Sequence, residues 1–114
     1  MSETIALRLP GLGRPLRVRA APSWRGAIGL PGNPDPDGPH GSWLRRCRRI
    51  HTIGLARAVD VVFLRADGVV TKVVKELKPW RSSGCPDAST VLQLRAGLAE
   101  RLRIEPGTAL DLLA

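Results

Sequence analysis

An acidic residue, Asp60, interrupts the apolar run from Val59 to Leu64. A carboxylate in such a run is costly to bury unless it is paired or hydrogen-bonded, so Asp60 is the first residue to consider for chemistry. It could act as a general base or anchor a ligand. It could also be a structural acid that holds a loop through backbone N–H groups. We favour the structural role, because buried charges are usually satisfied within the fold.

Four basic residues surround Cys47, namely Arg45, Arg46, Arg48 and Arg49. In a strand they would lie on both faces, which indicates an edge strand or an exposed approach segment. Such a cluster could bind phosphate, a nucleic-acid backbone or a carboxylate ligand. We prefer a solvated edge whose charges prevent sheets from pairing edge to edge.

Two cysteines, Cys47 and Cys85, lie far apart in the sequence, and His40 and His51 lie near the first of them. In a cytoplasmic chain such cysteines are expected to be free thiols. Zinc sites need closely spaced ligand pairs, and the sequence has no Cys-x-x-Cys or His-x-x-x-His. We therefore predict no metal site and no cofactor.

One tryptophan, Trp80, lies between Pro79 and Arg81 in a segment, residues 78–86, that we expect to be a loop. Its ring could stack on a ligand or cover the hydrophobic core. We favour core cover.

These residues must be positioned by a hairpin, residues 59–74, whose two β-branched runs are joined by Asp67-Gly68. Its first run is apolar at nearly every position, as in a central strand buried on both faces. A two-residue loop would place Asp60 opposite Lys75. A three-residue loop with Gly68 in the left-handed region would shift that pairing, and the sequence is compatible with both loops.

The rest of the chain also alternates with the period of short strands. We expect strands at residues 4–9, 16–20, 42–50, 89–94 and 109–113, a helix at 96–103, a helical turn capped by Ser23, and a Pro/Gly/Asp-rich loop at 31–41. The fold class is therefore mainly β, a small barrel or sandwich of six to seven short strands with one or two short helices. Ligand sites in such folds lie at the open end of the barrel or on a loop-covered face.

Length and composition favour one globular domain over residues 1–114. The net charge is +8, and fifteen of the eighteen basic residues are Arg, which fits either an acidic partner or the codon bias of a GC-rich genome. No apolar run approaches the roughly 20 residues that a membrane span needs. The N-terminus lacks the features of a secretory signal, so we expect a cytoplasmic location.

Several short motifs follow one another in a fixed order: residues 51–54, 59–64, 67–70, 78–81, 91–94, 96–97 and 104–107. This series resembles the DUF192 family of uncharacterised bacterial and archaeal proteins, from about Trp24 to the end of the chain. The resemblance implies a compact, mainly β single domain without an established activity. Some short relatives are encoded near pilus-assembly or secretion genes, which implies a protein partner in that context.

Within this resemblance, His51, Thr52, Asp60 and Gly68 match the family, so a shared site would centre on the first three, with Trp80 as a further ligand-binding candidate. A glutamate common in the family is Gln93 here, which removes an acid partner for His51 or an arginine.

Three functions are compatible with the sequence. The first, which we favour, is a small non-catalytic binding or accessory module, because no nucleophile–base pattern is present. The second is an enzyme with an acid–base pair at His51 and Asp60. The third is nucleic-acid or anion binding through Arg45 to Arg49, and the scarcity of aromatic residues for base stacking argues against nucleic acid.

Overall fold

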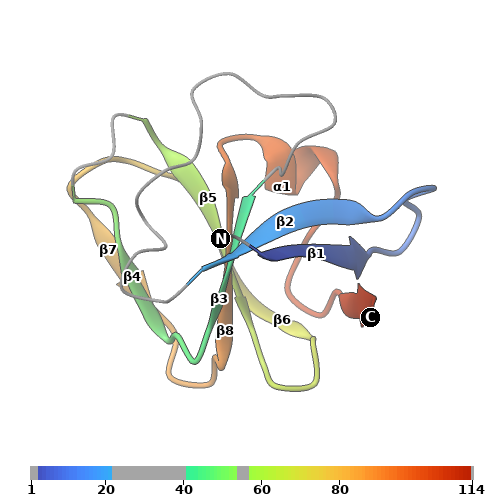
Figure 1. Cartoon of the computed structure of the whole chain (residues 1–114). Helices are drawn as coiled ribbons and strands as arrows, with labels where there is room; N and C mark the ends of the chain where they lie inside the picture. The colour runs from blue at the N-terminus through green and yellow to red at the C-terminus, as the bar shows by residue number, and fades with distance from the viewer. Residues whose placement is uncertain (1–2, 22–40, 54–56, 114) are drawn as a thin grey trace.

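The computed structural model describes residues 3–21, 41–53 and 57–113 (Figure 1). These residues form nine strands and one short helix, which confirms the mainly β fold class. The elements in chain order are β1 (Glu3–Arg8), β2 (Leu16–Ala21), β3 (Gly41–Arg45), β4 (Arg49–His51), β5 (Val59–Leu64), β6 (Val70–Leu77), β7 (Ser82–Gly84), β8 (Thr90–Arg95), α1 (Leu98–Arg101) and β9 (Asp111–Leu113).

Seven of the strands form one curved sheet in the order β6-β5-β8-β3-β2-β1-β9, and β4 and β7 form a separate two-stranded ribbon (Figure 1). All neighbours in the large sheet are antiparallel except β2 and β3, which are parallel. The two edges of this sheet approach each other at an isolated bridge between Val69 and Ala109. The Val70 N–H also donates to the Thr108 carbonyl at 2.8 Å. The sheet is therefore barrel-like without being a closed barrel.

Strand β5 lies between β6 and β8, and all six of its residues are buried, as predicted for a central strand. Side chains alternate across a strand, so β5 serves two hydrophobic clusters. Val62 and Leu64 join the larger cluster, which fills the concave side of the sheet. Val61 and Phe63 join the smaller cluster on the other face, together with Ile50 of the ribbon.

The hairpin turn contains three residues, with Gly68 in the left-handed region at φ 87°. The Arg65 N–H donates to the Val69 carbonyl at 2.9 Å, and the Gly68 N–H donates to the Arg65 carbonyl at 3.0 Å. A Cβ at position 68 would also lie 2.5 Å from the Leu110 carbonyl oxygen. Both the dihedral angle and the close approach therefore require glycine here.

Asp60 joins three elements of the fold through its wholly buried carboxylate. Its Oδ1 accepts the N–H of Glu76 at 2.8 Å, and its Oδ2 accepts the N–H groups of Gly97 at 3.0 Å and Ala99 at 2.9 Å. The β5–β6 register shifts at this point, and Glu76 lies at φ 55° in the bulge. This carboxylate thus holds both the bulge in β6 and the start of α1.

The predicted strand over 42–50 is wrong in its middle. Strand β3 ends at Arg45, Arg46 takes φ 54°, and β4 begins at Arg49. Cys47 lies in the break, where its buried side chain joins the smaller cluster and its N–H donates to the Ser89 carbonyl at 3.2 Å. Strand β3 has neighbours on both sides, so the edge-strand prediction is also wrong for Gly41–Arg45.

Two other elements differ in extent from the predictions. Strand β7 lies within the segment expected to be a loop, where it pairs with β4. Helix α1 is shorter than predicted, because Gly97 and Arg103 on either side of it take positive φ angles of 91° and 56°. The predicted helical turn at Ser23 and residues 31–40 of the predicted loop lie outside the described residues.

Replacing Asp60 should strongly destabilise the protein. Asp60→Ala removes three hydrogen bonds, one buried and two partly buried, and leaves their N–H donors without an acceptor, at a cost of about 1 kcal/mol or more for each. We therefore expect the free energy of unfolding, measured by urea denaturation, to fall by about 3 kcal/mol or more. The exposed Asp87→Ala is the matched control and should change stability by less than about 0.5 kcal/mol. Equal losses in the two variants would contradict the structural role of Asp60.

Candidate functional site

The β4–β7 ribbon places two of the predicted site residues at the surface. His51 pairs with Ser82, and Ile50 pairs with Ser83. Ile50 is buried against the sheet, whereas Arg49 and His51, on either side of it in β4, are exposed. The ribbon therefore covers the sheet with one face and presents basic side chains to solvent with the other.

Thr52 follows the ribbon and fixes the turn that leads into β7. Its side chain is wholly buried. The hydroxyl donates to the Lys78 carbonyl at 2.6 Å and accepts the Arg81 N–H at 2.8 Å. The backbone of Thr52 adds two bonds, from its N–H to the Arg81 carbonyl at 2.8 Å and from the Trp80 N–H to its carbonyl at 3.1 Å.

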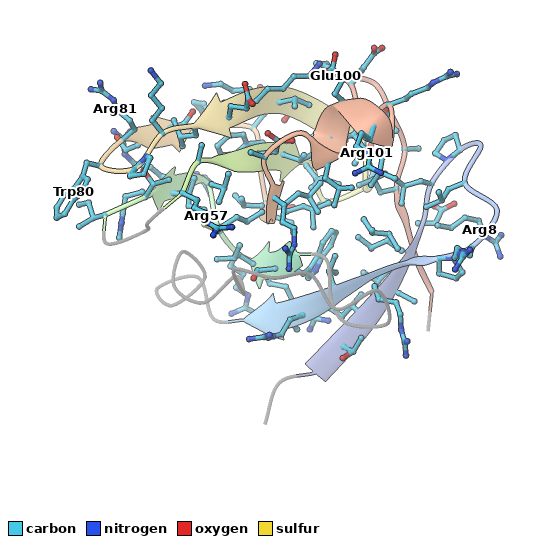
Figure 2. The ribbon with its side chains drawn as sticks, turned by 90° about the horizontal axis from the view of Figure 1, so that it is seen from above. Arg8, Arg57, Trp80, Arg81, Glu100 and Arg101 are labelled. Atoms are coloured by element: carbon cyan, nitrogen blue, oxygen red, sulfur yellow. The ribbon has the colours of Figure 1, made fainter. Side chains whose placement is uncertain are left out.

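This turn directs Trp80 into solvent. Trp80 takes φ 63°, a left-handed conformation that is unfavourable for a bulky residue, and its side chain is 70% exposed. Figure 2 shows the ring at one extremity of the molecule, pointing away from the chain, while the Arg81 side chain extends in another direction. The prediction that Trp80 covers the core is therefore wrong. Ile53, next to Thr52, is 50% exposed and adds a second apolar side chain to this tip.

We refer to Arg49, His51, Ile53, Trp80 and Arg81 as the Trp80 surface. All five side chains are exposed. Among the described residues, no carboxylate forms an ion pair with either arginine of this set. The surface therefore combines two apolar side chains with unneutralised positive charge.

Asp60 does not take part in this surface. Its two oxygens are occupied by backbone N–H groups, and His51 Nδ1 accepts the N–H of Ile53 at 3.4 Å. Within the described ranges, no hydrogen bond or ion pair joins His51 to Asp60. The geometry thus brings His51, Thr52 and Trp80 together and leaves Asp60 in a separate, structural position.

The arginine cluster is divided by the turn at Cys47. Arg45, Arg46, Arg48 and Arg49 are all exposed. However, Arg45 ends β3 in the large sheet, whereas Arg49 begins β4 in the ribbon. The four side chains therefore do not form one row along a single strand.

A cavity of about 390 Å³, which the sequence analysis did not locate, lies where β3 ends and β9 begins. Trp43 and Leu110 contribute apolar side chains to it, and Arg45 and Asp67 contribute charged ones. Arg65, also in its wall, forms an ion pair with Asp67 at 2.8 Å, which lowers the pKa of Asp67. The volume is within the range of ligand pockets. The residues that line this cavity come from segments far apart in the sequence, so no local sequence motif predicts it.

The cysteines are both free thiols. Burial raises the pKa of Cys47, whose Sγ donates to the Arg49 carbonyl at 3.1 Å. Cys85 is only half-buried, and its Sγ lies 3.4 Å from the Thr71 hydroxyl. In the part of the chain that the structure describes, no three His, Cys, Asp or Glu side chains are grouped to hold a metal ion. No described helix has the length and apolar character needed to span a membrane.

Thr52→Val should loosen the Trp80 turn while keeping the shape of the side chain. The variant removes the hydrogen bonds of the Thr52 hydroxyl to the Arg81 N–H and the Lys78 carbonyl, so stability should fall by about 1–3 kcal/mol. We expect the Trp80 and Arg81 amides to exchange with solvent at least about tenfold faster, measured by NMR. Thr71→Val, which removes a hydroxyl bonded to the Phe63 carbonyl, is the control. Unchanged exchange in Thr52→Val would contradict the role assigned to Thr52.

Cys47 should be the less reactive thiol. A raised pKa leaves less thiolate at a given pH, and burial also hinders the reagent. With a disulfide reagent at pH 8, we expect Cys85 to be labelled first and Cys47 to be labelled only at the rate of unfolding. Cys47→Ser and Cys85→Ser assign the two phases. Faster labelling of Cys47 in the folded protein would show that its environment is more open than the structure indicates.

Comparisons with known proteins place this fold in context. The model of the DUF192 family, described as uncharacterised, matches residues 20–112. None of the curated proteins compared with the chain matches it. A crystal structure of a protein of unknown function from Novosphingobium aromaticivorans DSM 12444 is similar, with a TM-score of 0.70, 18% identity, and coverage of 96% of this chain and 84% of that one.

A second similar crystal structure is that of a protein from Sinorhizobium meliloti 1021, provisionally described as a transcription regulator. Its TM-score is 0.74 at 20% identity, and the match covers 98% of this chain and 94% of that one. At such identities the likeness shows the fold alone, and neither description mentions pilus assembly or secretion. Because the family match extends over most of the sequence, the chain belongs to the DUF192 family.

Proposed function

We propose that this protein is a non-catalytic binding module that docks onto an acidic, partly apolar segment of another protein through the Trp80 surface. The observation that carries this proposal is the 70% exposure of Trp80 in a left-handed backbone conformation held by Thr52. Holding a non-glycine residue in that conformation costs about 1–2 kcal/mol. The fold therefore stabilises a tryptophan in solvent, where it contributes nothing to the core.

Tryptophan and arginine are the side chains that most often dominate protein–protein binding energy. Here Trp80 and Arg81 are adjacent, and Ile53 extends the apolar contact. Such a small, rigid tip fits a pocket or the apolar side chains of a short segment. Because Thr52 fixes the turn beforehand, little conformational entropy is lost when a partner binds.

The positive charge of the Trp80 surface favours an acidic partner. Arg49 and Arg81 form no ion pair with the described carboxylates, and the chain carries a net charge of +8. An acidic segment would neutralise these side chains and would also be attracted over a distance at low salt. Nucleic acid is less favoured, because Trp80 is the one exposed Trp, Tyr or Phe among the described residues, and base binding uses several such side chains.

An enzyme with His51 and Asp60 as its acid–base pair is not favoured by the geometry. Asp60 is wholly buried and bonded to three backbone N–H groups, so it lacks the access that a general base needs.

The test is a selection of displayed random peptides on the immobilised full-length protein. We expect peptides rich in Asp and Glu with interspersed apolar residues, whose affinity falls as salt rises. Trp80→Ala should weaken the binding of a selected, fluorescently labelled peptide by about 30-fold, as for a contact worth about 2 kcal/mol. Leu112→Ala is the matched control, because Leu112 is 49% exposed on β9, away from the ribbon. It should leave the affinity unchanged.

Three outcomes would overturn the proposal. The first is the selection of peptides without acidic residues, and the second is equal affinity in Trp80→Ala. The third is Trp80-dependent binding of labelled single-stranded DNA or RNA, or of vesicles containing anionic lipid, without any peptide binding. The nucleic-acid arm also tests the function that the relative's description suggests.

A further inference from the structure

Two polar side chains of β8, the buried Gln93 and the half-buried Arg95, contain buried atoms without hydrogen-bond partners. Gln93 is wholly buried, and neither its Nε2 nor its Oε1 forms a hydrogen bond. The Nε and Nη2 atoms of Arg95 are also buried and unbonded. Buried polar groups in native proteins nearly always have a partner, so these four atoms call for an explanation.

The two side chains share one face of the central sheet. Residues two apart in a strand project to the same side, with Cα atoms about 6.6 Å apart. Strand β8 lies between β5 and β3 (Figure 1). The register places Gln93 between Val61 and Ser42, and Arg95 opposite Val59. Their neighbours across the sheet are therefore two valines and a serine, and Ser42 is itself largely buried.

Arg95 requires a negative partner. Its guanidinium is always charged, and a partly buried charge without a counterion is unfavourable. Among the described residues, no carboxylate forms an ion pair with Arg95. The Nε–H and one Nη2–H of a guanidinium point the same way and match the two oxygens of a carboxylate. The unbonded edge of Arg95 is this fork, which distinguishes it from an arginine that only contacts solvent.

The unbonded amide of Gln93 indicates which further polar groups a ligand must carry. Its amide offers N–H donors and a carbonyl acceptor beside the Arg95 fork. The donor suits an oxygen of the same anion, whereas the acceptor needs a hydroxyl or amino group on the ligand. One arginine balances one negative charge, which favours a carboxylate over a doubly charged phosphate. Val59 and Val61, which lie beside these two residues, are apolar and favour a ligand with no further polar groups.

We propose that Gln93 and Arg95 form a binding site for a small monocarboxylate that carries a hydroxyl or amino group on the carbon next to the carboxylate. Arg95 holds the carboxylate, and Gln93 recognises the neighbouring polar group. This site is separate from the Trp80 surface, because Trp80 and Arg81 precede β7 while Gln93 and Arg95 lie in the central sheet. The two proposals therefore stand or fall independently.

The test is a titration of the ¹⁵N-labelled full-length protein with glycolate, followed by NMR. The Nε–H signal of arginine and the side-chain amide signals of glutamine report directly on the proposed contacts. We expect glycolate to shift the Arg95 and Gln93 side-chain signals saturably. Propionate lacks the hydroxyl and should bind about tenfold more weakly, as for the loss of one hydrogen bond. Sodium chloride at equal ionic strength is the control for non-specific screening.

Three variants assign the roles. Arg95→Gln should weaken glycolate binding at least about tenfold. Gln93→Leu should bind glycolate and propionate equally. Gln93→Glu supplies a carboxylate from within the chain, so it should raise the melting temperature and abolish glycolate binding, with the Arg95 Nε–H signal shifted already in the free protein.

The proposal is overturned if glycolate leaves both side-chain signals in place, since the four atoms would then be satisfied by water alone. It is also overturned if chloride produces the same shifts as glycolate, or if Arg95→Gln binds glycolate as tightly as the unchanged protein. Gln93→Leu could fail to fold. The titration of the unchanged protein and the Gln93→Glu variant decide the question in that case.

Discussion

The acceptance of three backbone N–H groups by Asp60 is the constraint on which the rest of the structure depends. Without this carboxylate, the bulge in β6 and the left-handed turn at Gly97 would each leave a backbone N–H without its acceptor. A bulge increases the local twist of a strand, and twist is what allows an open sheet to curve toward closure. The meeting of the sheet edges at Val69 and Ala109 follows from that curvature.

The two faces of the curved sheet carry different kinds of side chains. The concave face holds the larger cluster, in which the described residues are aliphatic apart from Trp43. The other face is covered partly by the ribbon through Ile50, and it also carries Gln93 and Arg95. The first face holds most of the buried apolar side chains together with Asp60, whereas Gln93, Arg95 and the ribbon lie on the second.

Much of this architecture could be predicted from the sequence, because its signals are local. The apolar run of β5, the Asp-Gly turn and the alternation of β1 and β2 each appear within a few neighbouring residues. The exposure of Trp80 was not predictable, because it depends on bonds from Thr52, distant in sequence. Positive φ angles at Arg46 and Trp80 have no compositional signal, since neither is glycine. The complete burial of Gln93 was not predictable either, because it depends on the pairing of β8 with strands on both sides.

The parallel pairing of β2 with β3 has a consequence for how the chain assembles. It joins an antiparallel half made of β6, β5, β8 and β3 to a second half made of β2, β1 and β9. A parallel pair cannot be closed by a tight turn, so this joint forms at a higher entropic cost than the hairpins on either side. During refolding, each half would then transiently present an unpaired edge strand, and strand exchange between chains would compete with the correct joint at high protein concentration.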